Sequence, residues 1–455
     1  MGIGYEPLFR HVLLPFYDQT LAGRGTLSFL AEYERSQWLP PEQLEALRWT
    51  KLKRLLEHCW REVPYYRRQW TELGITPEAI RTPADFARLP VLTKHDIRTH
   101  FESLKADSLR DSLLYKSTSG STGEPFRFGY TRESNDRRAA VMWRSYGWAG
   151  SRPGRRTLYL WAVPSGLKPL QAFKQRLYNR AYNRLMLDSF AMRDDTMVRY
   201  ADAIDAWRPE IVVGYVGPLV RLSQWLLANG RRIHRPAAVL GAAESLHDFQ
   251  REIVERAFGA PAFNTYGCRE FMLIASECEK REGLHVNADH LHVEIGTPLP
   301  SAAERAAGEI IVTDLSNFGM PFIRYTTGDL ATPADAPCSC GRSLPLLARV
   351  QGRKLDAIRT IDGRYLPGEY FPFIFNDVKW IKRFRIVQRR LEAIELQLVV
   401  DGEADATRLD ATRALVTRAL GDGIELDIRV VDDIPVAANG KFRVTISELS
   451  DPPVP

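Results

Sequence analysis

The sequence has little cysteine and no long apolar run, and both shortages restrict the kind of protein it encodes. Its 455 residues include only 5 cysteines, too few for a disulfide-dense secreted scaffold. No stretch approaches the roughly 18 consecutive apolar residues that a membrane-spanning helix needs. The N-terminal stretch "MGIGYEPLFRHVLLPFYDQT" lacks the basic start and clean apolar core of a signal peptide. We therefore expect a cytoplasmic protein with reduced cysteines and no membrane span.

The sequence also lacks a strong excess of either charge. The 62 lysines and arginines against 56 acidic residues give a net charge of +6. This small excess favours anionic ligands such as nucleotides or CoA-like molecules, but only weakly. The basic residues lie in short scattered clusters without a recognisable nucleic-acid module. We do not expect nucleic acid as a partner.

The order of apolar patterns predicts an α/β protein with two domains, since 455 residues exceed one ordinary domain. Region 1–108 is predicted to be mainly helical. From about residue 109 to residue 330, short apolar runs alternate with helical stretches, as in α/β folds. A small α+β pattern follows. We predict a large N-terminal domain over 1–351 and a small, mobile C-terminal domain over 352–455. The helices expected within the α/β region include 195–206, 216–229 and 247–258.

One polar run suggests a ligand. The nine residues of "STSGSTGEP", from Ser117 to Pro125, hold three serines, two threonines and two glycines. Such a run exposes N–H and hydroxyl donors without bulk, which suits phosphate oxygens. It is not a Walker A loop, because Gly123 is followed by Glu-Pro instead of Lys-Ser/Thr. A surface connector is the alternative. The candidate phosphate-binding residues are Ser117, Thr118, Ser119, Gly120, Ser121, Thr122 and Gly123.

This run resembles the phosphate loop of the adenylate-forming superfamily of acyl-CoA synthetases and adenylation domains. More narrowly, the chain resembles the branch that contains phenylacetate–CoA ligase and the CapK-type proteins. The likeness covers most of the chain, through "VPYYRRQW", "LPVLTKHDI", "NTYGCRE", "GEIIVTDLSNFGMPFIRYTTGDL", "CSCGRSLPLLARVQGRKLD" and "NGKFR", in the family's order. The resemblance implies a large domain of β-sheets flanked by helices and a small α+β lid domain.

The segment "NTYGCRE" supplies the first candidate site residues. By resemblance, Tyr266 lies on adenine, Gly267 lets the backbone approach the ligand, and Glu270 binds Mg²⁺, for which a carboxylate is a suitable donor. Taken alone, the segment is a weak signal and favours a turn that carries an exposed glutamate. The family usually has Ser or Thr before the glutamate, whereas this chain has Arg269, and the role of that arginine is open.

Other matching segments add nucleotide contacts. Ala242, Ala243 and Glu244 lie between an expected strand and helix, where α/β sheets bind ligands; a helix start with small packing residues is the alternative. The resemblance assigns Asp329 to the two ribose hydroxyls. It also assigns Arg353 to a second ribose contact, beside the family's hinge.

A lysine near the C-terminus is the candidate catalytic residue. Lys441 matches the family's catalytic lysine, whose ammonium would stabilise the charge that develops during adenylation. A solvated turn is the alternative for an isolated Gly-Lys pair. Trp161 and Tyr215 are candidates for the acid pocket, although both also fit a core.

Four residues form a candidate metal site. Cys278, His285, Cys338 and Cys340 supply three sulfurs and one imidazole, a complete tetrahedral zinc set. Their spacing departs from ordinary finger patterns and leaves the assignment open. Members of the branch carry similar sets that bind zinc, so the resemblance implies structural Zn²⁺. We expect Cys59 to lie in the core.

The expected function is that of an AMP-forming ligase that uses ATP and Mg²⁺ to activate a carboxylic acid. By resemblance, the acid is aryl or arylacetic and the acceptor is CoA. An amine, a hydroxyl or a carrier-protein thiol is the alternative acceptor, as in ligases of natural-product or polysaccharide biosynthesis. A non-catalytic nucleotide-binding protein is a third alternative. Homodimer formation is left open.

Overall fold

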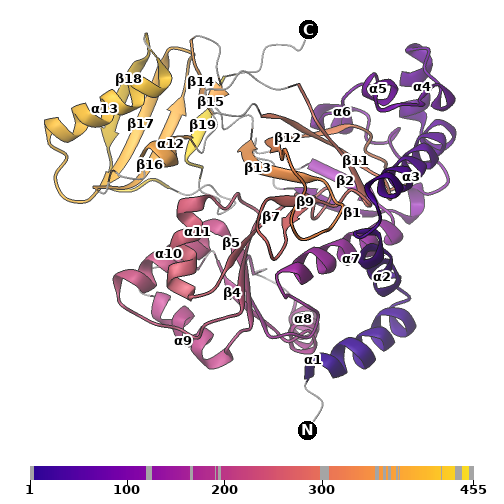
Figure 1. Cartoon of the computed structure of the whole chain (residues 1–455), viewed down its shortest axis with the longest axis horizontal. Coiled ribbons are helices and arrows are strands. Elements are labelled where there is room, and N and C mark those ends of the chain that lie inside the picture. Colours follow the sequence, from indigo (N-terminus) through magenta and orange to yellow (C-terminus); the bar gives the residue numbers. More distant parts are fainter. Residues whose placement is uncertain are drawn as a thin grey trace. The chain divides into compact units, whose positions relative to one another are not determined.

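The chain divides into two compact units (Figure 1). The computed structural model describes residues 5–118, 126–163, 168–189, 191–192, 196–297, 307–353, 358–361, 365–366, 370–375, 378, 380–421, 423–435 and 443–449. The first unit comprises Met1–Glu294, Ile311–Thr326 and Ala334–Ala348, and the second comprises Ile295–Ile310, Thr327–Pro333 and Arg349–Pro455. The domain boundary between residues 351 and 352 stays a prediction.

Helices occupy the N-terminal region, as the apolar spacing predicts. They are α1 (Tyr5–Leu8), two π-helical turns (Phe9–Leu13 and Phe16–Leu21), α2 (Thr26–Ser36), α3 (Pro41–Glu62), α4 (Pro64–Glu72), α5 (Pro83–Ala87) and α6 (Lys94–Thr99). Thr82 and Thr93 begin α5 and α6 with capping boxes, which satisfy backbone donors of the first helical turn. Cys59 on α3 is fully buried, as expected.

Among the described residues, eleven strands form one sheet in the order β10-β11-β12-β13-β9-β8-β7-β6-β5-β3-β4. Strands β4, β3, β5, β6 and β7 run parallel, whereas β7, β8 and β9 pair antiparallel. The strands are β3 (Thr157–Trp161), β4 (Arg184–Asp188), β5 (Ile211–Tyr215), β6 (Ala238–Ala242), β7 (Ala262–Tyr266), β8 (Ala275–Glu277), β9 (Leu284–Val286), β10 (Leu291–Ile295), β11 (Gly308–Asp314), β12 (Tyr325–Pro333) and β13 (Leu346–Arg353).

Helices cover the parallel strands because these strands are apolar on both faces. One core cluster joins strand residues such as Leu160 and Val212 to α9 (Met197–Trp207), α10 (Val216–Ala228) and α11 (Asp248–Phe258). The opposite cluster joins strand residues such as Val213 to Tyr146, which lies on α7 (Arg132–Trp148). The three helices predicted after residue 190 are therefore confirmed, within a few residues at their ends.

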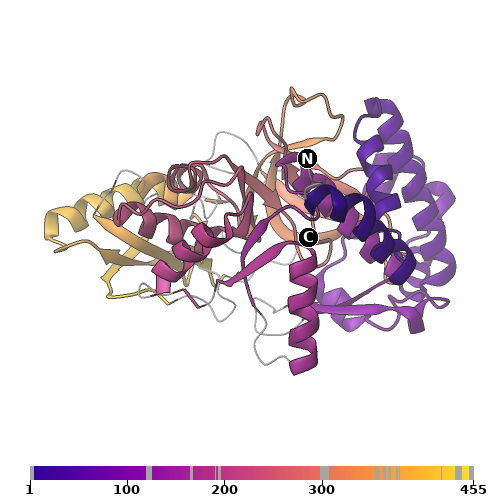
Figure 2. The same cartoon turned by 90° about the horizontal axis from the view of Figure 1, so that it is seen from below.

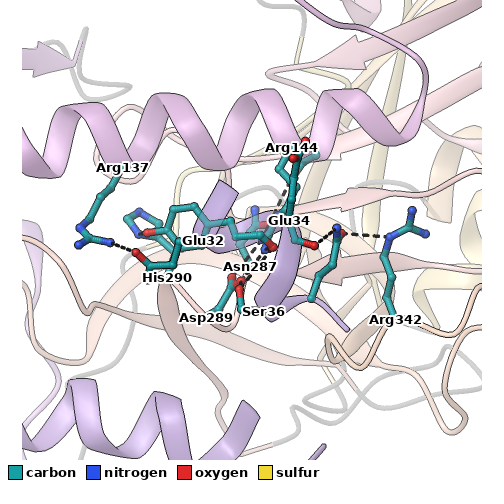
Figure 3. A network of polar contacts seen from close by, with 12 residues as sticks. Glu32, Glu34, Ser36, Arg137, Arg144, Asn287, Asp289, His290 and Arg342 are labelled. Carbon is teal, nitrogen blue, oxygen red and sulfur yellow. Dashed lines mark hydrogen bonds and ion pairs between the residues drawn. The ribbon is translucent and has the colours of Figure 1, made fainter. Parts of the chain in front are cut away.

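A buried polar network ties α2 and α7 to the segment before β10 (Figure 3). The guanidinium of Arg144 donates to the Asn287 side chain at 2.6 Å and to the Asp289 carboxylate at 3.0 Å. Ser36 donates to the same carboxylate. Arg144 and Asp289 have side-chain exposures of 1% and 0%. Because a buried charge is costly without a partner, these two residues must be present together.

The second unit contains a small α+β fold. Its four-stranded sheet has the order β18-β17-β16-β19, with β16 (Ile381–Gln388) antiparallel to β17 (Ala393–Val400). Helix α13 (Ala406–Leu420) contributes Val416 and Leu420 to a core shared with the sheet. Strands β18 (Glu425–Val430) and β19 (Thr445–Ser447) complete it, and β14 (Ile358–Arg359), β15 (Tyr365–Leu366) and α12 (Tyr370–Phe375) precede it. No helix in the described ranges is long and apolar enough to cross a membrane.

Candidate nucleotide site and cysteine–histidine cluster

The carboxyl ends of β5 and β6 carry the first candidate residues. Ala242 ends β6 and is buried, and Ala243 follows with a positive φ of 64°. The Glu244 carboxylate accepts a hydrogen bond of 2.7 Å from the backbone N–H of Gly217, at the start of α10. This contact connects the loops after neighbouring parallel strands, where open α/β sheets bind ligands.

The turn after β7 explains why residue 267 is glycine. A Cβ atom at Gly267 would lie 1.9 Å from the carbonyl oxygen of Met272, so a larger residue would force the backbone to move. Met272 has a positive φ of 66°, and its N–H donates to the Cys268 carbonyl at 2.7 Å. The turn is thus tightly closed. It holds Tyr266, a half-buried aromatic residue, at the strand end.

Glu270 lies inside this turn and is buried, with 4% of its surface exposed. The Tyr325 hydroxyl donates to its Oε1 at 2.9 Å. The alternative of an exposed glutamate on a turn is therefore wrong. One hydrogen bond from a neutral hydroxyl orients the carboxylate and leaves further lone pairs, a suitable state for a hard metal ligand.

Lys116 is a further candidate site residue, which the sequence reasoning did not name. It lies on β1 (Leu114–Thr118), which pairs with β2 (Phe126–Tyr130). Burial, together with the positive charges of Arg138 and Arg269, lowers the pKa of Lys116 to about 8. Arg269 is exposed, and its charge also acts on Tyr215. Lys116 therefore lies within electrostatic range of two other cations, Arg138 on α7 and Arg269 in the turn after β7. The signal in the sequence was the lysine directly before the predicted phosphate loop.

The predicted phosphate loop is described only at its start. Ser117 and Thr118 end β1, opposite Arg127 and Phe126 on β2. Residues 119–123 lie outside the described residues, as does Lys441. Trp161 and Tyr215, the acid-pocket candidates, are half-buried and lie against each other, with ring centroids 4.1 Å apart.

The ribose candidates belong to the second unit. Asp329 is half-buried on β12, and its backbone N–H donates to the Thr327 hydroxyl at 3.2 Å. Gly328 before it has a φ of 77°, a conformation that glycine adopts at little cost. Arg353 is the last residue of β13. The nucleotide roles of both residues stay predictions.

The four candidate metal ligands come together within the first unit. Their ligand atoms all lie within 4.8 Å of one another. The Cys278 and Cys338 sulfurs are 3.6 Å apart, too far for a disulfide of about 2.05 Å. The Cys340 sulfur lies 3.3 Å from His285 Nε2. Ligands on one tetrahedral zinc ion, with bonds of about 2.0–2.3 Å, would be separated by roughly 3.3–3.8 Å.

Surrounding contacts orient these ligands. His285 Nδ1 lies 3.2 Å from the Leu344 carbonyl, so Nδ1–H donates there and Nε2 keeps its lone pair towards the sulfurs. Burial lowers the pKa of His285, which keeps the ring neutral. The N–H groups of Lys280 and Arg342 each lie 3.4 Å from a sulfur and can stabilise thiolates. The residues present fit a structural zinc ion.

The chain is similar in sequence to known proteins over most of its length. The family model of the CapK C-terminal domain matches residues 358–448. The chain is 28% identical to phenylacetate-coenzyme A ligase of Thermus thermophilus over 442 residues, covering 89% of this chain and 96% of that protein. It is 23% identical to protein CapK of Staphylococcus aureus over 382 residues, covering 81% of each.

The fold also matches a solved structure, that of 2-hydroxyisobutyryl-CoA ligase in the postadenylation state. The TM-score is 0.72 at 21% identity, covering 91% of this chain and 92% of the other. This likeness shows that the chain shares the fold of that ligase. Over most of its length the chain is similar in sequence to phenylacetate-coenzyme A ligases and to protein CapK.

Proposed function

We propose that this protein is an ATP-dependent, AMP-forming ligase that activates a carboxylic acid and transfers the acyl group to CoA. The acid's carboxylate attacks the α-phosphorus of ATP and pyrophosphate leaves. The CoA sulfur then attacks the acyl carbon of the adenylate and AMP leaves. The observation that carries the proposal is the closed turn after β7, which buries Glu270. This turn follows the carboxyl end of β7, next to the parallel strand β6, whose last residue is Ala242.

In this proposal, the residues at and after the ends of β6 and β7 and those of β1 bind adenine and phosphates. Tyr266 stacks on adenine, and the strand end at Ala242, Ala243 and Glu244 lines its edge. Glu270 binds the Mg²⁺ that bridges the phosphates, since carboxylate oxygen is a preferred ligand of that ion. Lys116, partly buried and already next to a second cation, stabilises phosphate charge together with the run from Ser117 to Gly123.

Three further residues supply the remaining proposed contacts. Asp329 accepts both ribose hydroxyls, and Arg353 makes the second ribose contact near the hinge. Lys441 contributes an ammonium to the adenylation step, where positive charge stabilises the developing transition state. Aryl or arylacetic acids are the proposed substrates, because phenylacetate-coenzyme A ligases are among the relatives. The cytoplasm is the proposed location.

A zinc ion held by Cys278, His285, Cys338 and Cys340 would have a structural role. All four tetrahedral positions are taken by protein ligands, so no position remains for substrate or water. The ion would join the β8–β9 segment to the segment before β13, about fifty residues later in the chain, and its binding free energy would add to folding.

The direct test is to incubate purified protein with ATP, Mg²⁺ and a panel of aryl, arylacetic, fatty and amino acids. We expect pyrophosphate exchange with an aryl or arylacetic acid, and acyl-CoA once CoA is added. Exchange without acyl-CoA would instead identify an amine, hydroxyl or carrier-protein acceptor. No exchange with any acid would overturn the proposed activity.

A further inference from the structure

Helix α8 (Pro169–Ala181) has an unusual position for a helix of its length. None of its residues is buried, and it projects away from the rest of the first unit, as the magenta helix pointing downward in Figure 2 shows. By comparison, α10 also has 13 residues and buries Val216, Leu219, Leu222, Ser223 and Leu226. Tyr178 and Ala181 at its C-terminal end pack against the cluster of Phe9, Leu14 and Tyr182, but packing against the described residues does not bury the other side chains of α8.

The exposed face of α8 is apolar. Leu170, Phe173 and Leu177 have exposed fractions of 64%, 64% and 58%. At about 3.6 residues per turn, their spacing of three and four residues places them in one stripe along the helix. Exposed apolar side chains that are gathered in this way mark a surface that binds something.

The charges on α8 indicate what it binds. Lys174, Arg176 and Arg180 lie on the helix and Lys168 directly precedes it, and no acidic residue occurs from 168 to 181. At 3.6 residues per turn, Lys174 lies on one side of the stripe and the two arginines lie on the other. None of these four cations forms an ion pair with any residue that the structure describes.

We propose that α8 is a peripheral membrane-binding helix that lies flat on a bilayer rich in anionic lipids. Leu170, Phe173 and Leu177 insert between the headgroups, and the flanking cations contact lipid phosphates. Long basic side chains can extend from an apolar stripe to a charged surface in this way. The 13 residues span only about 20 Å along the axis, too short to cross the hydrocarbon region.

A second copy of the chain fits this face less well. Two α8 helices packed along their stripes would bring at least six uncompensated cations together, and like charges disfavour such an interface. An anionic bilayer instead provides apolar and negatively charged partners at once. With three inserted side chains, the binding by α8 should be reversible and sensitive to salt.

The test is co-sedimentation of the full chain with vesicles. Wild-type protein should bind vesicles made of equal parts phosphatidylglycerol and phosphatidylcholine. It should bind vesicles of phosphatidylcholine alone at least about tenfold more weakly, since each cation increases the affinity for an anionic surface about fivefold. The double variant Phe173→Gln/Leu177→Gln should bind at least about tenfold more weakly, because two apolar side chains no longer insert. Lys174→Glu/Arg176→Glu should lose most of the binding as well.

Val198→Gln is the matched control, because Val198 is 50% exposed on another helix of the same unit, and it should bind like wild type. Circular dichroism should show that all variants are folded. The proposal would be overturned if wild-type protein does not bind anionic vesicles, or if the α8 variants bind them as strongly as wild type. A dimer that dissociates on Phe173→Gln/Leu177→Gln, in protein that does not bind vesicles, would overturn it too and identify a second copy as the partner.

Discussion

Replacing Gly267 by alanine is a sharp perturbation of the candidate site, because the structure gives the size of the clash. The added Cβ would lie 1.9 Å from the Met272 carbonyl oxygen and 3.0 Å from the Leu273 Cα atom. Carbon and oxygen approach to about 3.3 Å even in close contacts, so the turn must open by roughly 1.4 Å. The clashing atoms are backbone, which no side-chain rotation can relieve.

The expected loss is larger in activity than in stability. Forcing an extra carbon into packed structure typically costs about 1–3 kcal/mol, which a protein of this size can survive. A displacement of about 1 Å at a catalytic site can cost about 10²-fold in rate. Tyr266 directly precedes the turn and Glu270 lies inside it, so opening the turn would displace both. We expect Gly267→Ala to be folded but to lose about 10²-fold in ATP–pyrophosphate exchange.

Gly147→Ala is the matched control. A Cβ there meets no atom within 4 Å, and the residue lies near the end of α7, where alanine should stabilise by about 0.5–1 kcal/mol. Thermal unfolding and exchange should be measured on both variants. The reasoning would be refuted by Gly267→Ala with wild-type exchange, or by an equal loss of exchange in both variants.

Four further predictions follow from the site and its support. Asp289→Ala should destabilise the protein by about 3–5 kcal/mol in chemical denaturation, because it leaves a buried guanidinium without its partner. ATP affinity should be level below pH 8 and fall as the pH rises through it, because the neutral amine of Lys116 must take up a proton to hold phosphate. Cys338→Ser should lose about one zinc per chain in elemental analysis and unfold at a lower temperature, whereas Cys59→Ser should keep the metal. Lys441→Ala should slow acyl-adenylate formation by orders of magnitude in single-turnover assays, while transfer from supplied acyl-adenylate survives.

Each of these has a contradicting outcome. Destabilisation by Asp289→Ala no larger than that by Asp401→Ala, whose partner Lys382 is exposed, would argue against a buried charge pair. If the ATP affinity of Lys116→Met still falls above pH 8, a group other than Lys116 is responsible for the pH dependence. Zinc-free protein purified without chelator would refute the metal site. Equal losses in both half-reactions would mean that Lys441 does not act in adenylation.

The sequence predicted features that local chemistry determines. Alternating apolar runs and helical stretches led to the parallel strands and to α9, α10 and α11, because each element's apolar period is set by its own geometry. The candidate zinc ligands were chosen from residue type together with the family resemblance, and the fold does bring all four within reach of one ion.

Features that depend on distant residues were missed. The low pKa of Lys116 comes from burial and from Arg138 and Arg269, which lie far along the sequence. The charge pair of Arg144 and Asp289 spans 145 positions, and neither residue shows a local signal. Helix α8 was not named among the expected helices, although Leu170, Phe173 and Leu177 recur at helical spacing; that spacing does not show whether the stripe is buried or exposed.

Acid-dependent ATP–pyrophosphate exchange, followed by acyl-CoA formation in the same preparation, tests the central claim most directly. With an aryl or arylacetic acid, the account predicts exchange that requires Mg²⁺, is lost in Glu270→Ala, and yields AMP and acyl-CoA when CoA is added. Protein that binds ATP but shows no exchange with any acid of the panel would contradict the account and indicate a nucleotide-binding protein without ligase activity.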